Sequence, residues 1–113
     1  MPGWIRRLGG VVRGGPVSVT TTDEYRVVRR IFAVGITPLS VFIENTGSSN
    51  ALLRITSVVG GIEYDEVVEN VLTAGDVYKV VLTGSYDYVN IYAKSGSAGN
   101  PTTLKISWSG VRV

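Results

Sequence analysis

The chain has 113 residues, of which 44% are apolar, and a formal net charge of +2 at pH 7. This length suits one domain with its own core. Cysteine and histidine are both absent, which excludes disulfides, thiolate metal sites, cysteine nucleophiles and imidazole acid–base catalysis. We therefore predict a protein that is not an enzyme and has no cofactor.

The start of the chain is glycine-rich and basic. Residues 1–15 contain five glycines, and we predict that they form an extended arm ahead of a β-sandwich domain spanning residues 16–113. Tryptophan and arginine are frequent anchors in protein contacts, so we expect the arm to bind a neighbouring subunit. An apolar tip folded back onto its own sandwich is the alternative. The predicted contact residues are Trp4, Ile5, Arg6, Arg7, Leu8 and Arg13.

The charge is distributed unevenly along the chain. Residues 1–30 carry six arginines against two acids, a net +4, whereas residues 31–113 carry five bases against seven acids, a net −2. Arginine binds carboxylates or phosphates through two donors and tolerates burial at contacts. These arginines could therefore contact another molecule, or they could form an ordinary solvated basic surface. Nucleic-acid binding by the arm alone would be weak and sensitive to salt.

From Pro16 onward, short runs rich in β-branched residues alternate with turn formers. This pattern predicts an all-β fold of about eight strands in two packed antiparallel sheets, connected as a jelly roll or Greek key. The predicted strands are Val17–Thr22, Tyr25–Val34, Leu39–Asn45, Ala51–Val59, Ile62–Glu69, Val77–Thr83, Tyr88–Lys94 and Thr103–Ser109.

Strict alternation within these runs predicts which side chains face the core. In the run that begins at Ala51, Leu53 and Ile55 should lie inside while Arg54 and Thr56 face water. The strongest core candidates, from the third and the last strands, are Leu39, Val41, Ile43, Leu104, Ile106 and Trp108.

One segment also fits a helix. Apolar residues between Glu63 and Gly75 recur at helical spacing, with Asp65 placed as a cap and Gly75 as a stop. Because the surrounding sequence is all β, we predict a strand followed by a loop, with a two-turn helix as the alternative.

Four acidic residues fall within this segment: Glu63, Asp65, Glu66 and Glu69. They could bind Ca²⁺, but their order lacks the alternation and the turn glycine of a calcium loop, and a strand would divide them between its two faces. We therefore predict no metal site. A solvated acidic edge, on which a neighbour's basic arm could dock, is the favoured interpretation.

Three tyrosines, Tyr86, Tyr88 and Tyr92, near Trp108, could form a stacking platform for sugar rings or for single-stranded nucleic acid. Ordinary packing in the core or at its rim is favoured, because no basic groove accompanies them. The sequence also shows neither a membrane-spanning run nor a signal peptide. We accordingly expect synthesis in a host cytoplasm and no contact with membranes.

From about Val41 to Val111, the order of elements resembles small β-sandwich structural proteins of the virions of tailed phages and related viruses. The segments that carry the resemblance are Ile43–Gly47, Leu72–Gly75, Tyr88–Ser95 and Gly99–Leu104. Tyr64 stands where that group usually has another aromatic residue, and the basic arm has no counterpart in it. The resemblance implies capsid decoration or a head-tail or tail-surface position, often as a trimer, and no catalytic residues.

Together these features predict a virion structural protein that assembles through its arm and its sheet edges. The expected partners are further copies of the chain, with a trimer favoured, and a capsid or tail protein. We expect no small-molecule substrate. The alternatives are a carbohydrate-binding module and a subunit of an extracellular filament linked by strand donation.

Overall fold

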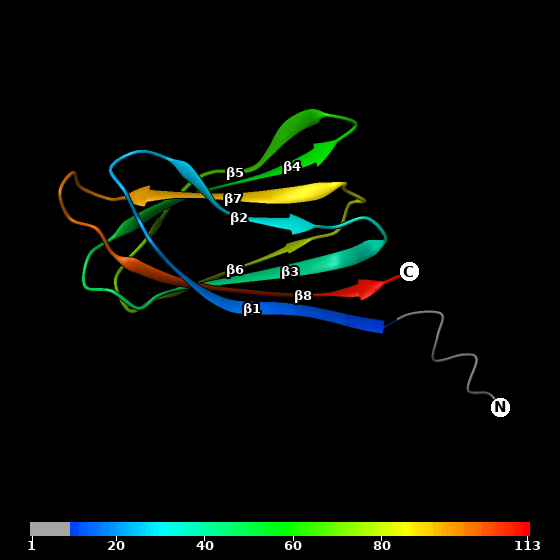
Figure 1. Cartoon of the computed structure of the whole chain (residues 1–113), viewed down its shortest axis with the longest axis horizontal. Helices are drawn as coiled ribbons and strands as arrows, with labels where there is room; N and C mark the ends of the chain where they lie inside the picture. Colours follow the sequence, from blue (N-terminus) through cyan, green and yellow to red (C-terminus); the bar gives the residue numbers. More distant parts are fainter. Residues whose placement is uncertain (1–9) are drawn as a thin grey trace.

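The computed structural model describes residues 10–113, which form eight strands and no helix (Figure 1). The all-β sandwich predicted from the sequence is confirmed. The strands are β1 (Gly10–Thr20), β2 (Arg26–Phe32), β3 (Ile36–Asn45), β4 (Ala51–Val59), β5 (Ile62–Leu72), β6 (Val77–Leu82), β7 (Tyr88–Ser95) and β8 (Thr103–Arg112).

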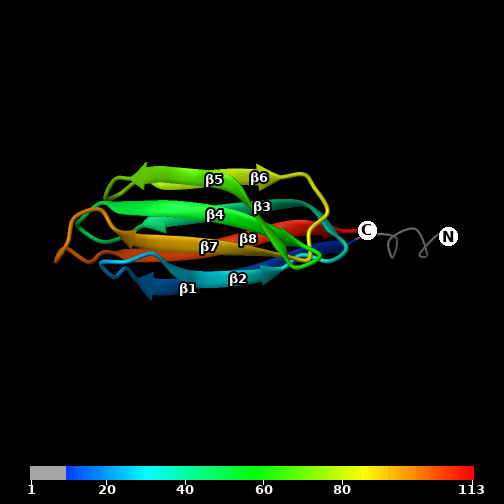
Figure 2. The same cartoon turned by 90° about the horizontal axis from the view of Figure 1, so that it is seen from above.

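The strands form two antiparallel sheets of four. Sheet A has the order β1-β8-β3-β6, and sheet B has the order β2-β7-β4-β5, which is the jelly-roll arrangement. Successive strands pass from one sheet to the other, except that β4 and β5 form a hairpin within sheet B. Gly60 and Gly61 make its two-residue turn with φ of 59° and 81°, a conformation that favours glycine at both positions. Seen from above, β5 and β6 lie along one side of the sandwich, and β1 and β2 lie along the other (Figure 2).

The core lies between the sheets and consists of alternate residues of most strands. Five of the six strongest core candidates are fully buried: Leu39, Val41, Ile43, Leu104 and Ile106. Trp108 is half-buried and packs against this core from its rim. The alternation of strand residues therefore predicted the core correctly.

The expectation for Thr56 was wrong. Leu53 and Ile55 are buried as expected and Arg54 is partly exposed, but Thr56 has 0% exposure. Thr56 does lie on the outer face of sheet B, where its hydroxyl donates to the Glu63 carboxylate. A face can therefore point away from the core and still be covered by long side chains from the next strand.

The segment that also fits a helix is the strand β5, which runs as far as Leu72. Pairing with β4 gives this backbone a hydrogen-bonded partner over most of its length, so tertiary pairing overrides the helical spacing. The register shifts twice, between Leu53 and Ile55 and between Ile55 and Thr56. Such bulges are common at sheet edges, and β5 is an edge strand.

Residues 10–15, which were predicted to belong to the arm, are part of β1, so the sandwich is not confined to residues 16–113. Position 14 requires glycine for close packing, because a Cβ there would clash with the Trp108 indole. Gly15 has a φ of 76° within a bulge that precedes Pro16. The glycines of residues 1–15 predicted a loose arm. At Gly14 and Gly15, however, the geometry of the sheet requires glycine.

We expect Gly14→Ala to lower the free energy of unfolding by about 1–3 kcal/mol, because the added methyl group overpacks the site beneath Trp108. The matched control is Gly10→Ala, since a Cβ at Gly10 meets nothing within 4 Å. Urea unfolding of both variants measures the difference. Equal stabilities of the two would show that the indole does not constrain residue 14.

Candidate functional site

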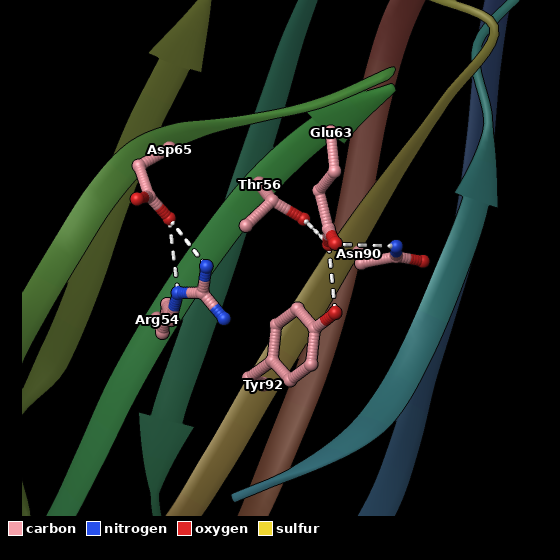
Figure 3. Close-up of polar contacts among 6 residues, drawn as sticks. All are labelled: Arg54, Thr56, Glu63, Asp65, Asn90 and Tyr92. Atoms are coloured by element: carbon pink, nitrogen blue, oxygen red, sulfur yellow. Dashed lines mark hydrogen bonds and ion pairs between the residues drawn. The ribbon is translucent and has the colours of Figure 1, made fainter. Parts of the chain in front are cut away.

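The outer face of sheet B carries most of the side-chain hydrogen bonds that connect its strands. Glu63 on β5 is the centre of this network (Figure 3). Its Oε2 atom accepts hydrogen bonds from the Thr56 hydroxyl, from Asn90 Nδ2 at 3.3 Å and from the Tyr92 hydroxyl at 2.7 Å. One carboxylate therefore joins β5, β4 and β7.

These contacts shift the pKa values of both ionisable partners. The hydrogen bonds from Thr56 and Tyr92 lower the pKa of Glu63 below its ordinary value of 4.5, because they favour the charged carboxylate. The same carboxylate raises the pKa of Tyr92 above 10.0, with burial contributing in the same direction. Glu63 is therefore negative and Tyr92 neutral across the physiological pH range.

An ion pair lies beside this centre. Arg54 Nε donates to Asp65 Oδ1 at 2.9 Å, and a second guanidinium nitrogen lies 2.8 Å from the same oxygen (Figure 3). The hydrogen bond to Asp65 raises the pKa of Arg54. The Arg54 guanidinium also lies 5.0 Å from the ring centroid of Tyr92.

The four predicted acidic residues are all on β5, where each accepts a hydrogen bond from within the chain. Glu66 accepts from the Ser57 hydroxyl at 2.9 Å, and Glu69 accepts from the Tyr25 hydroxyl at 3.2 Å. In residues 10–113 no group of three or more acidic residues is arranged to hold a metal ion. The four residues share an edge strand but do not converge on one point.

The three tyrosines of the predicted platform are divided between two environments. Tyr88 and Tyr92 pair with outward-facing residues of β4. Tyr86 packs against the core, and its hydroxyl accepts a hydrogen bond from the Gly84 amide at 3.0 Å.

Arginine side chains lie over the rings of Tyr88 and Tyr92. The Arg30 guanidinium lies 4.3 Å from the Tyr88 ring centroid, as Arg54 lies over Tyr92. A sugar that stacked on those ring faces would have to displace an arginine.

The predicted arm residues lie mostly outside the described part of the chain: Trp4, Ile5, Arg6, Arg7 and Leu8. Arg13 is exposed on β1 and pairs in register with Ser109. The surface of residues 10–113 has no cavity, and within that range no helix is long and apolar enough to cross a membrane.

Four residues of this face were not predicted as parts of a site: Arg30, Arg54, Thr56 and Asn90. Strand alternation does place Asn90 on the same side as Tyr88 and Tyr92, and this is the signal that was available. Which strand lies beside β7, and in what register, depends on the jelly-roll connectivity, so the Glu63 contacts could not be inferred from spacing.

The pKa values of Tyr25 and Tyr92 are both raised, so we expect the tyrosinate absorbance of the wild type to include late-titrating groups, one of which is lost in Tyr92→Phe. In Glu63→Gln the pKa of Tyr92 should fall towards 10.0, because the carboxylate that raises it is gone. Tyr64→Phe, which leaves the Glu63 contacts intact, is the matched control. An unchanged titration in Glu63→Gln would contradict the assignment.

Folding lowers the pKa of Glu63, so its stabilising contribution is present above about pH 4.5 and is lost as the pH falls through the folded-state pKa. Glu63→Gln should therefore lose less stability than the wild type on acidification. Urea unfolding at a series of pH values measures this difference, and parallel pH curves would contradict it.

No protein-family model matches the chain, and no curated protein sequence matches it. Solved structures do match. The chain is similar to a structure of Bacillus endospore appendages, described as disulfide-linked pili, with a TM-score of 0.61 and 11% identity over 93% of this chain and 86% of that chain. It is similar to PirA with a TM-score of 0.51 and 15% identity over 88% and 92% of the two chains.

A viral chain matches as well. The structure of infectious bursal disease virus, Gt strain, matches with a TM-score of 0.55 and 12% identity over 92% of this chain but 32% of that one. The chain thus spans about a third of the viral chain. At these identities the likeness shows the fold alone: a β-sandwich that also occurs in a viral and in a pilus protein. Membership of the tailed-phage group stays a prediction.

Proposed function

We propose that this chain is a structural protein that functions by self-assembly, as a repeated subunit of a virion surface. The observation that carries the proposal is the position of the exposed apolar side chains. Of the thirteen large ones in residues 10–113, nine lie on the four edge strands and four lie elsewhere. Phe32 on β2 is 74% exposed, and Val68 on β5 is 70% exposed. Unpaired edges with exposed apolar residues are sites at which other chains add.

The N-terminal arm is the second part of the proposal. Trp4, Ile5 and Leu8 would bury apolar surface on a neighbour, while Arg6 and Arg7 would pair with acidic residues of its β5. Two features support this docking: the arm is basic, and the β5 edge is acidic with exposed apolar residues between its acids. A capsid or tail protein would be the further partner, and the chain would perform no catalytic step.

A filament subunit is the second candidate. It is favoured by the match to the endospore appendage, which covers most of both chains, whereas the viral match covers a third of the viral chain. That appendage is described as disulfide-linked, and this chain has no cysteine. Any filament that it forms must therefore be held together without disulfides.

The test compares the full chain with a variant that lacks residues 1–9. The deletion has to stop there, because β1 begins at Gly10 and a longer deletion would remove part of sheet A. We expect the full chain to sediment as an oligomer and the deletion variant, with an unchanged circular dichroism spectrum, to sediment at lower mass. A monomeric full chain would overturn the proposal. If the deletion variant assembles as well as the full chain, the arm has no role in assembly.

A further inference from the structure

The two edge strands of sheet B carry charges of opposite sign. β2 has three basic residues and no acidic one, and β5 has four acidic residues and no basic one. The two strands lie on opposite sides of the molecule when it is seen from above (Figure 2). The charged residues are Arg26, Arg29 and Arg30 on β2 and Glu63, Asp65, Glu66 and Glu69 on β5.

Little of this charge is neutralised within the molecule. In residues 10–113 the one ion pair is the contact between Arg54 and Asp65. On β2, the guanidinium of Arg29 lies 4.8 Å from the Trp108 ring centroid, and Arg30 also lies over an aromatic ring. Such contacts leave the positive charge uncompensated. The acids of β5 other than Asp65 accept hydrogen bonds from neutral hydroxyl and amide groups.

The directions of the strands suit contact between two copies. Sheet B has four strands and every neighbouring pair is antiparallel, so its two edge strands run in opposite directions. A second copy displaced sideways, without rotation, therefore places its β5 antiparallel to β2 of the first. Antiparallel pairing is the more stable arrangement per residue.

The register suits the same contact. The bulge of β2 precedes Arg29, and the bulges of β5 follow Asp65, so Arg29–Phe32 and Ile62–Asp65 are both regular. Residues that pair in register across β2, β7, β4 and β5 form rows that run from one of these segments to the other. The rows are Phe32, Tyr88, Val58 and Glu63; Ile31, Val89, Ser57 and Tyr64; and Arg30, Asn90, Thr56 and Asp65.

We infer that β2 of one copy binds β5 of the next and extends sheet B from subunit to subunit. On the outer face Arg30 lies opposite the next copy's Asp65, and on the inner face Ile31 meets Tyr64. This contact joins two different surfaces, so it repeats into an open row unless a rotation closes it into a ring. A symmetric contact through two β2 strands would place arginines opposite each other, which is unfavourable. The inference rests on the proposed self-assembly and adds a contact through Ile62–Asp65 of β5, which leaves the rest of that strand for the arm of a neighbour.

Two charge-reversed variants test the contact. Arg26→Glu/Arg30→Glu gives β2 a net charge of −1, so that both edges are acidic, and Asp65→Lys/Glu66→Lys/Glu69→Lys gives β5 a net charge of +2, so that both edges are basic. A single exposed ion pair contributes little, but each variant replaces several attractions by repulsions, so we expect each variant alone to need about 10–100-fold more protein to associate. An equimolar mixture of the two should associate as the wild type does, because each acidic edge again meets a basic one.

The matched control for the β2 variant is Lys105→Glu/Arg112→Glu on β8, which makes the same change in net charge in sheet A. It should associate as the wild type does. Sedimentation velocity measures all four samples, and circular dichroism checks that each is folded. If a reversed variant is unfolded, Arg30→Gln and Asp65→Asn take its place, each with a smaller loss of association.

Folded variants that associate as strongly as the wild type would overturn this contact and leave the proposed function standing. A mixture that stays dissociated while both of its components are folded would overturn it as well. A wild type that is monomeric throughout would overturn both the contact and the proposed function.

Discussion

Asn45→Ala is expected to lower the free energy of unfolding by about 3–5 kcal/mol, among the largest losses that one substitution causes. The Asn45 side chain has 0% exposure. Its Nδ2 atom donates to the carbonyl oxygens of Ser49 at 2.7 Å and Leu72 at 3.0 Å, and its Oδ1 atom accepts from the Gly47 amide at 3.1 Å and the Thr102 hydroxyl at 2.7 Å. Alanine at position 45 removes the hydrogen-bond partner of the two carbonyl oxygens, the amide and the hydroxyl. A buried polar group without a hydrogen-bond partner costs about 1–3 kcal/mol.

The matched control for Asn45 is Asn70→Ala. Asn70 lies on β5, and its side chain makes one exposed hydrogen bond, to the carbonyl oxygen of Val71. We expect its loss to stay within about 0.5 kcal/mol, as for most surface substitutions. Urea unfolding compares the two variants. A similar small loss in both would show that Asn45 does not hold the end of β3 to the loops around it.

Trp108→Ala is expected to lower the free energy of unfolding by about 2–4 kcal/mol, because it removes a large side chain that packs on the rim of the core. The indole also lies over Gly14 and beneath Arg29, so the loss opens the side of the sandwich formed by β1 and β2. Thermal or urea unfolding measures it. A loss below that of Gly14→Ala would contradict this role.

The two substitutions at this site should also be coupled. In the Trp108→Ala background the added methyl group of Gly14→Ala meets no indole, so its destabilising effect should disappear. Residues in direct contact depart from additivity in this way. A double variant whose loss equals the sum of the two single losses would show that the close approach is not what requires glycine at position 14.

The fold was largely predictable from the sequence, since alternation and turn formers depend on neighbouring residues. Leu39, Val41 and Ile43 could be assigned to the core because every second residue of a strand shares a face. The Gly60 and Gly61 pair likewise marked the β4–β5 turn. Predicted strand ends differ from the observed ones by a few residues, most of all at β1, where the glycines indicated an arm.

The site depends on which strands are neighbours, and spacing does not encode that. Thr56 was expected to face water because nothing in its own run shows that Glu63 covers it. The acids of β5 were recognised as a group, but their opposition to the arginines of β2 appears only once both strands are placed at the edges of one sheet. Rows such as the one joining Arg30 to Asp65 are properties of the sheet register.

Assembly through charged sheet edges is tested by sedimentation velocity of the full chain over a wide range of concentrations, at low and at high salt. We expect a mass that rises above that of a dimer as the concentration increases. We also expect the mass to fall when salt screens the contacts between charged edges. A single species at 12.1 kDa under all of these conditions would contradict this assembly.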